Sequence, residues 1–211
     1  MKTTFYIVRH GTTPWNAQKR WQGQTDSPLS EFGLKQGALL TGYFQDIPVD
    51  VGVSSPLQRA RQTLKFALEG KENVEIRIEE GVLEMNQGEA EGKTYEEIYA
   101  LYPEYALNDA HEPSKAIAPG GEDAQNVYRR MRDTFLKLAK LYPGKTIVVV
   151  SHAFAIGTFL NFAKGNPSDK MVRMIPANVS VSKCTIDENG QPHLEYWDDT
   201  SHIPEELVFN Y

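Results

Sequence analysis

Two unbroken apolar segments of the chain are rich in β-branched residues. They lie at residues 5–8 and 147–150, and neither contains a charged position. Runs of this kind are typical of strands that are buried on both faces of a parallel sheet. Shorter patterns of the same type lie near residues 50–54 and 74–79. These segments therefore predict the strands of a largely parallel sheet.

Helical patterns lie between these segments. Ser30 can cap a helix that continues to about Phe44, because a serine side chain accepts a hydrogen bond from the first turn of a helix. Pro56 is expected at the first position of another helix, where its missing N–H has no cost. Apolar residues at helical spacing over 124–139 predict a long helix whose arginines and lysines face solvent. A further helix is expected after His152.

Strands that alternate with helices predict an α/β fold, a three-layer α/β/α sandwich around a mostly parallel sheet. Residues 179–186 and 193–197 add two late strands, on either side of a turn signal at Glu188-Asn189-Gly190. The chain has no internal repeat, low-complexity tract or linker. We therefore expect residues 1–211 to form a single domain.

One segment does not fit the alternation. Residues 93–120 are expected to hold a short helix near 95–102 and then to be irregular up to Pro119-Gly120-Gly121. An insertion of this length beside the strand ends often forms a lid or a substrate loop. Its aromatic residues either anchor the insertion to the rest of the protein or line a substrate pocket. They are Tyr95, Tyr99, Tyr102 and Tyr105.

Polar side chains follow each of the first four predicted strands. Ligands of open α/β sheets collect at the carboxyl ends of the strands, so these side chains are expected to meet at one edge. They are Arg9 and His10 after the first strand, Ser54, Ser55 and Arg59 after the second, Glu84 after the third, and Ser151 and His152 after the fourth.

The composition is that of an ordinary globular protein, with 40% hydrophobic and 24% charged residues among 211. The 22 basic and 28 acidic side chains give a net charge of −6, which argues against a nucleic-acid partner. Seven of the acids, and no lysine or arginine, lie in residues 187–211. We interpret that segment as a solvated acidic edge.

Three features that the sequence lacks bear on the cellular environment of the chain. No apolar run reaches the length that crosses a membrane, and no secretory signal precedes Arg9. The single cysteine, Cys184, cannot form a disulfide within the chain. These observations predict a cytoplasmic protein without a membrane partner.

Arg9-His10-Gly11 lies directly after the first predicted strand. The planar guanidinium of an arginine matches phosphate oxygens, and a histidine can act as a nucleophile that holds a covalent intermediate. Gly11 would let the backbone approach a ligand closely. The tripeptide alone is a weak signal, since an arginine and a histidine at a strand end are usually structural.

A series of short motifs surrounds that tripeptide. In chain order, these are Arg9-His10-Gly11-Thr12-Thr13, Trp15-Asn16, Arg20, Gln22-Gly23, Asp26-Ser27-Pro28-Leu29-Ser30, Gly33, residues 54–63, Leu83-Glu84-Met85, Gly88, Glu91-Gly92, Pro119-Gly120-Gly121-Glu122 and Val149-Val150-Ser151-His152-Ala153. In this order, over residues 5–153, they resemble the histidine phosphatase superfamily, the phosphoglycerate mutase-like group. Thr12 stands where that family most often has Glu, and Ala153 where it most often has Gly; neither change removes a catalytic group.

The resemblance implies a role for each matching residue. His10 would be the nucleophile that becomes phosphohistidine, and Glu84 the proton donor and acceptor. Arg9, Arg59 and His152 would bind the transferring phosphoryl group. Further contacts to substrate or phosphate are implied for Gly11, Asn16, Arg20, Gln22, Gly23 and Ala153. No cofactor is implied, and the five histidines have no short metal-ligand spacing, so no catalytic metal is expected.

The charges fit a phosphate monoester, which carries about −1.5 to −2 near neutral pH. Arg9 and Arg59 supply two positive charges, and a protonated His152 would add a third. His10 must keep a lone pair to attack, and nearby cations would favour that neutral form by lowering its pKa. Glu84 must carry a proton for the departure of the leaving group and then accept one from water.

Both hydrolases and mutases belong to this superfamily. Residues 93–120 contain two lysines and five acids, and a segment with this negative charge is poorly suited to bind a bisphosphorylated ligand. The insertion is also short compared with that of mutases resembling phosphoglycerate mutase. We therefore expect a metal-independent phosphoric monoester hydrolase of the histidine acid phosphatase type. A 2,3-bisphosphoglycerate-dependent phosphoglycerate mutase is the alternative, and a phospholigand-binding regulator without turnover is a third. A small phosphorylated metabolite is the expected partner; its identity and a possible homodimer stay open.

Overall fold

The computed structural model describes residues 1–209, and within them a six-stranded sheet forms the centre of the fold. The strand order is β3-β2-β4-β1-β5-β6. All six strands lie where the apolar patterns predict them. They are β1 (Thr3–Arg9), β2 (Val51–Ser54), β3 (Glu75–Ile78), β4 (Thr146–Ser151), β5 (Val181–Ile186) and β6 (Pro192–Asp199).

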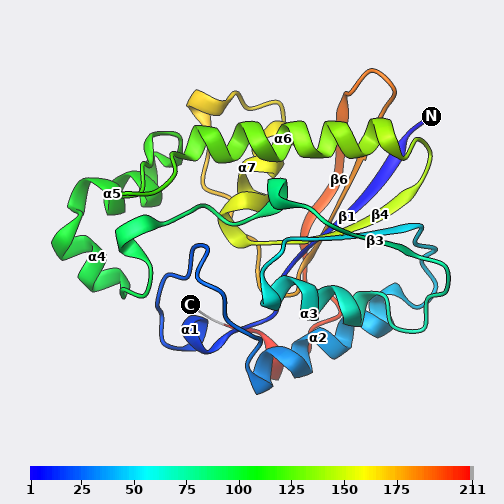
Figure 1. The fold of residues 1–211 in the computed structure, drawn as a ribbon, viewed down its shortest axis with the longest axis horizontal. Coiled ribbons are helices and arrows are strands. Elements are labelled where there is room, and N and C mark those ends of the chain that lie inside the picture. The colour runs from blue at the N-terminus through cyan, green and yellow to red at the C-terminus, as the bar shows by residue number, and fades with distance from the viewer. Residues whose placement is uncertain (210–211) are drawn as a thin grey trace.

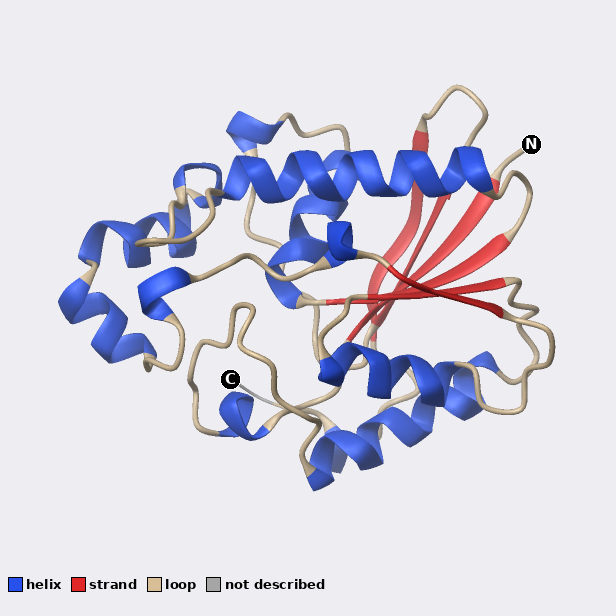
Figure 2. Ribbon diagram, in the orientation of Figure 1, coloured by secondary structure: helices blue, strands red, loops and turns tan. Residues whose placement is uncertain are grey.

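Helices cover both faces of this sheet. Figure 1 shows α2 and α3 on one face and α6 and α7 on the other, and Figure 2 shows the sheet between these two layers. The predicted three-layer α/β/α sandwich is therefore confirmed. The helices are α1 (Pro14–Ala17), α2 (Glu31–Phe44), α3 (Gln58–Ala67), α4 (Tyr95–Leu101), α5 (Pro103–His111), α6 (Ala124–Leu141) and α7 (Ala153–Ala163).

The alternation of side chains along β1 divides the core into two hydrophobic clusters. Phe5 and Ile7 belong to the cluster beneath α6 and α7, where Phe135 and Phe159 stack with ring centroids 3.7 Å apart. Tyr6 and Val8 belong to the cluster beneath α2 and α3. Because successive side chains of a strand point to opposite faces, one apolar strand contributes to both clusters.

The pairing of the strands fixes the edge where the polar residues meet. The pairs β1–β4, β4–β2 and β2–β3 are parallel, whereas β5 pairs antiparallel with both β1 and β6. Arg9 lies opposite Ser151, and Ser54 lies opposite Val150. The carboxyl ends of the parallel strands therefore lie at the same edge, as the sequence predicts.

The predicted start of α3 is wrong by two residues. Ser30 caps α2 as expected, since its side chain accepts a hydrogen bond from the Gly33 amide. Pro56, however, precedes the N-cap residue Leu57, and α3 begins at Gln58. The amide of Gln58 donates to Asp26 Oδ1 at 2.7 Å. A side chain 32 residues away thus satisfies the helix start, and the local sequence could not reveal it.

The insertion at residues 93–120 is more ordered than expected. Its first helix, α4, matches the prediction, but α5 occupies a stretch that was expected to be irregular. Pro103 stands at the first position of α5, where its fixed φ favours a helix. Figure 1 shows α4 and α5 at one end of the molecule, beyond the sheet. Ile98 and Tyr105 are buried in the cluster beneath α6 and α7.

The acidic segment at residues 187–211 includes edge strand β6, whose side chains are buried only in part. Glu195 of this strand forms an ion pair with Lys183 at 2.8 Å. Residues 210 and 211 of the segment lie outside the described part of the chain. None of the described helices is both long enough and apolar enough to cross a membrane.

We expect Gly33→Ala to destabilise the fold. A Cβ at Gly33 would lie 1.9 Å from the Thr12 carbonyl oxygen, so α2 and the loop after β1 would have to separate. Overpacking of this kind costs about 1–3 kcal/mol. Urea unfolding measures the change. Gly42→Ala in the same helix is the control: it meets no atom within 4 Å and should raise the free energy of unfolding by about 0.5–1 kcal/mol. A Gly33→Ala protein as stable as the wild type would contradict the expectation.

Candidate active site

A cavity of about 510 Å³ opens at the carboxyl ends of the parallel strands. Four of the five side chains expected to be catalytic line it, namely Arg9, His10, Arg59 and Glu84. They come from the end of β1, from α3 and from the segment after β3. The cavity is within the usual size range of small-molecule sites, roughly 300–1,000 Å³.

The imidazole of His10 is oriented by its own neighbour in the chain. Nδ1 of His10 lies 2.7 Å from the carbonyl oxygen of Gly11. A carbonyl only accepts, so Nδ1 carries the hydrogen and Nε2 carries the lone pair. Burial, Arg59 and Arg9 all hold the pKa of His10 well below its ordinary value. The ring is therefore neutral near pH 7, with a nucleophilic nitrogen in a site lined by cations.

The two arginines beside His10 are almost entirely buried. Arg9 donates from Nη1 to the carbonyl oxygen of Pro176 at 2.7 Å. Arg59 donates to the carbonyl oxygens of Thr25 and Gly23, at 2.9 and 2.7 Å. Burial lowers the pKa of Arg59 to about 10, so it is still a cation at neutral pH.

Glu91 holds the turn that binds Arg59. Its Oε1 accepts from the amide of Gln24 at 2.8 Å, and its Oε2 accepts from the amide of Thr25 at 3.0 Å. Gly23 in this turn has a φ of +52°, and a Cβ there would lie 2.1 Å from Glu91 Oε1. The turn therefore needs a glycine at 23, and Glu91 positions the two carbonyl groups that Arg59 contacts.

His152 is fully buried and is not among the residues that line the cavity. Its ring centroid is 5.1 Å from that of His10, and its Nε2 is 2.8 Å from Ser55 Oγ. Burial is the largest cause that holds its pKa well below the ordinary value, followed by the charge of Arg59. The direction of this shift favours a neutral His152, in which case the imidazole does not add the third positive charge that its protonation would supply.

The hydrogen bonds of Ser55 indicate which nitrogen of His152 carries the hydrogen. Ser55 Oγ accepts from the amide of Leu57 at 3.3 Å, and Nε2 of His152 is the only acceptor within reach of its hydroxyl hydrogen among the described residues, so we assign the hydroxyl as the donor to Nε2. Nδ1 then carries the ring hydrogen. Among the described residues, that buried Nδ1 has no hydrogen-bond partner.

Glu84 is held at the N-terminus of α7. Its Oε1 accepts from the amides of Met85 and Ala155, at 2.8 and 3.0 Å, and its Oε2 accepts from the amide of Phe154 at 3.1 Å. A carboxylate oxygen has about two acceptor sites. Within the described chain, the hydrogen bonds thus fill Oε1 and leave one site open on Oε2.

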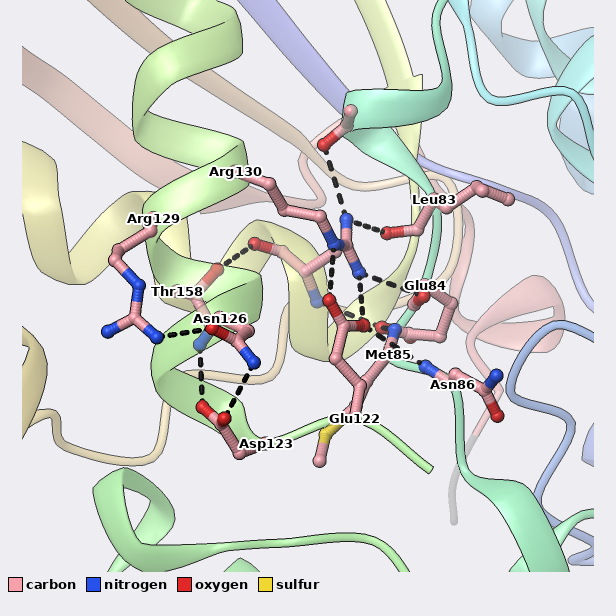
Figure 3. Close-up of polar contacts among 12 residues, drawn as sticks. Leu83, Glu84, Met85, Asn86, Glu122, Asp123, Asn126, Arg129, Arg130 and Thr158 are labelled. Carbon is pink, nitrogen blue, oxygen red and sulfur yellow. Dashed lines mark hydrogen bonds and ion pairs between the residues drawn. The ribbon is translucent and has the colours of Figure 1, made fainter. Parts of the chain in front are cut away.

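Arg130 of α6 fixes the backbone that carries Glu84. It donates to the carbonyl oxygens of Leu83 and Glu84, at 2.6 and 2.9 Å. Figure 3 shows its guanidinium between these carbonyls and the carboxylate of Glu122, which it contacts at 2.9 Å. The prediction that the arginines of this helix face solvent is wrong here. Glu122 belongs to a motif quoted above, but Arg130 had no such signal.

Three residues predicted to contact phosphate, Asn16, Gln22 and Arg20, line the cavity but differ in the hydrogen bonds that they make. Asn16 Oδ1 accepts from the amide of Thr13 at 3.0 Å, so its NH₂ group is left for the cavity that it lines. Gln22 Oε1 likewise accepts from Ser27 at 2.8 Å. Arg20 also lines the cavity, but its Nη1 donates to the Gly92 carbonyl oxygen at 2.6 Å.

Ala153 and Gly11 are also predicted to contact substrate or phosphate, and they differ in whether they line the cavity. Ala153 lines the cavity at the first position of α7. Gly11 does not line it, and the reason for a glycine there is packing. A Cβ at Gly11 would lie 2.8 Å from the carbonyl oxygen of Gly33. Gly11 is therefore needed for a close approach of the backbone to α2, and its contact with a ligand stays a prediction.

Several cavity residues were missed by sequence reasoning. Arg173, from the segment after α7, forms an ion pair with Asp109 of α5 at 2.6 Å, and both line the cavity. No motif marked them, because the pair joins segments 64 residues apart. The tyrosines of the insertion divide between the two alternatives: Tyr105 is buried against Gln87 and anchors the insertion, whereas Tyr95 lines the cavity, whose use as a substrate pocket stays a prediction.

The charge that lines the cavity is positive. Five basic and three acidic side chains take part, so the net charge is +2 with His10 neutral. Clefts lined by one sign of charge attract ligands of the opposite sign. Within the described residues, no group of three or more histidine, cysteine or acidic side chains could hold a metal ion.

The family model described as histidine phosphatase superfamily (branch 1) matches residues 5–200. The chain belongs to this superfamily. It is 37% identical over 146 residues to phosphoserine phosphatase 1 of Hydrogenobacter thermophilus, with 69% of each chain covered. It is 29% identical over 204 residues to the probable phosphoglycerate mutase GpmB of Yersinia pestis, with 94% of each covered.

The fold of this histidine phosphatase superfamily member matches that of a solved structure over nearly its whole length. Bacillus stearothermophilus YhfR superimposes with a TM-score of 0.89 at 28% identity, covering 96% of this chain and all of that one. The phosphoglycerate mutase-like α/β fold implied by the sequence motifs is thereby confirmed. The curated relatives include both a phosphatase and a probable mutase, so membership alone does not select the reaction.

We expect the protein to lose stability in mild acid, because His10 and His152 are buried without charge. Their pKa values lie below the ordinary 6.5, so below that pH the unfolded chain binds more protons than the folded chain. The free energy of unfolding should fall as the pH drops through about 6.5, by up to about 1.4 kcal/mol per pH unit for each histidine. It should be insensitive to these groups above about pH 7.5.

Urea unfolding at about pH 7.5 and about pH 5.5 measures this loss. His10→Gln removes one of the two contributions, so the loss should shrink by about half. His111→Gln, at an exposed position of α5, is the control and should leave the loss as in the wild type. An identical pH dependence in the wild type and His10→Gln proteins would contradict the analysis.

Proposed function

We propose that the protein is a phosphatase that hydrolyses a small phosphate monoester through a phosphohistidine intermediate on His10. The observation that carries the proposal is the state of that imidazole: Nδ1 donates to Gly11, so the lone pair on Nε2 lies in a cavity lined by Arg9 and Arg59. Phosphoryl transfer requires mainly positioning and compensation of charge on the equatorial oxygens. The two guanidinium groups supply both.

In the first step, Nε2 of His10 attacks phosphorus and the bond between phosphorus and the ester oxygen breaks. The leaving oxygen takes the proton of Glu84, for which Oε2 has the open acceptor site described above. In the second step, Glu84 accepts a proton from water as that water attacks phosphorus. The bond between phosphorus and Nε2 then breaks, and inorganic phosphate leaves with His10 neutral again.

His152 takes part in this mechanism as a neutral donor. Its Nδ1–H, which has no partner in the described part of the chain, would donate to an equatorial oxygen. The NH₂ group of Asn16, which lines the same cavity, would donate to another. Together with Arg9 and Arg59, these groups would surround the three oxygens that carry the charge of the transferring group.

We favour hydrolysis over mutase chemistry because the insertion at residues 93–120 contributes acids as well as tyrosines to the cavity. Glu96 and Asp109 line the cavity from this insertion, and both would repel a second phosphate. One observation favours the mutase alternative: Lys19, Arg20 and Arg173 line the cavity from outside the insertion.

We also propose that the described chain acts as one domain and that the insertion closes one side of the cavity. Its buried residues Ile98 and Tyr105 belong to the same cluster as Phe5 of β1. A bridge between Arg20 and Thr94 joins the insertion to the loop after α1. The insertion is thus fixed to the main body at both its core and its edge.

We expect the wild-type protein to release phosphate from p-nitrophenyl phosphate without added metal, and His10→Ala to lose activity by about 10³-fold or more, because the nucleophile is absent. Rapid quench with a labelled phosphate ester should trap an acid-labile label in the wild type. His111→Ala is the control. Equal activity of the wild type and His10→Ala proteins would refute the proposal.

The same assays separate the alternatives. A mutase would convert 3-phosphoglycerate to 2-phosphoglycerate, with stimulation by 2,3-bisphosphoglycerate and little release of phosphate. That result would contradict the proposed hydrolase. Tight binding of phosphate without trapped label would indicate a regulator.

Arg130→Lys should lower kcat because the backbone that holds Glu84 would lose its bidentate support. General acids contribute about 10²- to 10⁴-fold, so a misplaced Glu84 should cost about 10- to 100-fold for an alkyl phosphate. The loss should be smaller for p-nitrophenyl phosphate, whose leaving group needs little protonation. The kcat of both substrates measures this difference.

The matched control is Arg129→Lys, because Arg129 is the exposed neighbour that bonds to Asn126 on the same helix (Figure 3). This variant should leave the kcat for both substrates unchanged. Equal losses for both substrates in Arg130→Lys would indicate a purely structural role.

A further inference from the structure

Arg173 lines the same cavity as His10, but it has no part in the mechanism above. It lies between α7 and β5, and its side chain is 41% exposed. We propose that Arg173 forms a second anion subsite that selects phosphate monoesters whose organic part carries a carboxylate. This inference rests on the proposed phosphatase function and names the class of its substrate.

The hydrogen bonds of Arg173 leave one edge of its guanidinium available. Nη1 donates to the carbonyl oxygen of Asp109 at 2.9 Å and to Asp109 Oδ2 at 2.6 Å, which uses both of its hydrogens. A guanidinium has five N–H donors. The other three, on Nε and Nη2, have no acceptor among the residues that the structure describes. The Nε–Nη2 edge has the fork geometry that binds a carboxylate through two parallel hydrogen bonds.

Asp109 holds this edge in place. Its side chain is only 4% exposed, and it belongs to α5, whose Tyr105 and Ala106 are buried in the core. Tyr95 of the same insertion lines the cavity with this pair. A guanidinium that is already oriented loses less conformational entropy when it binds.

The charge of the outer cavity fits one carboxylate better than a second phosphate. Beyond Arg9 and Arg59, three basic side chains (Lys19, Arg20 and Arg173) and two acidic ones (Glu96 and Asp109) line the cavity, for a net charge of +1. A carboxylate brings one negative charge, whereas a second phosphate would bring about −1.5 to −2. The outer cavity therefore complements a monoanionic group.

The experiment compares two pairs of phosphate esters that differ in the carboxylate. They are 3-phosphoglycerate with glycerol 3-phosphate, and O-phosphoserine with O-phosphoethanolamine. Charge-assisted hydrogen bonds correspond to roughly 10- to 100-fold, so in each pair the wild type should hydrolyse the acid with a kcat/KM higher by about that factor. Arg173→Gln should bring both ratios close to one, and Arg173→Lys, which keeps the charge but loses the fork, should give intermediate ratios.

Two further variants serve as controls for the substitution of Arg173. Arg173→Gln leaves Asp109 buried without its partner, so the double variant Arg173→Gln/Asp109→Asn tests the same loss without an unpaired charge. Arg132→Gln is the matched control, because Arg132 lies on α6, pairs with Asp133 and does not line the cavity. Its ratios should equal those of the wild type.

Binding to a His10→Ala protein separates the failure of this subsite from the failure of the phosphatase proposal. Calorimetry should give tighter binding of both acids than of their counterparts, and Arg173→Gln in that background should abolish the difference. Hydrolysis without a preference that depends on Arg173 would overturn the subsite alone. A preference in binding without phosphate release by the wild type would overturn the hydrolase and leave the subsite.

Discussion

The site depends on one electrostatic constraint: two arginines are buried beside an imidazole that must stay uncharged. Arg59 contacts the carbonyl oxygens of Gly23 and Thr25, and Arg9 donates to the carbonyl oxygen of Pro176. The charges of both arginines, together with burial, hold the pKa of His10 below its ordinary value. A phosphoryl group that enters this region would relieve the mutual repulsion of the cations, so the site is suited to a dianion.

The supports of the site are peptide groups more than side chains. Glu91 fixes the turn whose carbonyls hold Arg59, Arg130 fixes the carbonyls on either side of Glu84, and the first amides of α7 hold the Glu84 carboxylate. Arg59 and Glu84 are thus each oriented by a backbone segment that a second charged residue, Glu91 or Arg130, orders. Such an arrangement keeps the reacting groups within the small tolerances that catalysis requires.

The fold could be predicted from the sequence because local patterns of apolar and polar residues indicate its strands and helices. Buried strands at residues 5–8 and 147–150 are apolar on both faces, and their order with the helices leaves few topologies. The motifs around His10 located most of the cavity. Features that depend on distant partners could not be predicted: Asp26 sets the start of α3, Asp109 orients Arg173, and burial rather than local sequence decides the neutral state of His152.

Val179 has a φ of +54° although it is buried and β-branched, a conformation that costs about 1–3 kcal/mol. Its amide bonds to the Arg9 carbonyl oxygen at 3.0 Å, and the neighbouring Asn178 side chain bonds to the His10 carbonyl oxygen across 168 residues. The backbone at residues 9 and 10 is therefore held by a segment 168 residues away in the chain, and the first strand alone cannot orient His10. The final position of this imidazole depends on late, long-range contacts, however early the first strand forms.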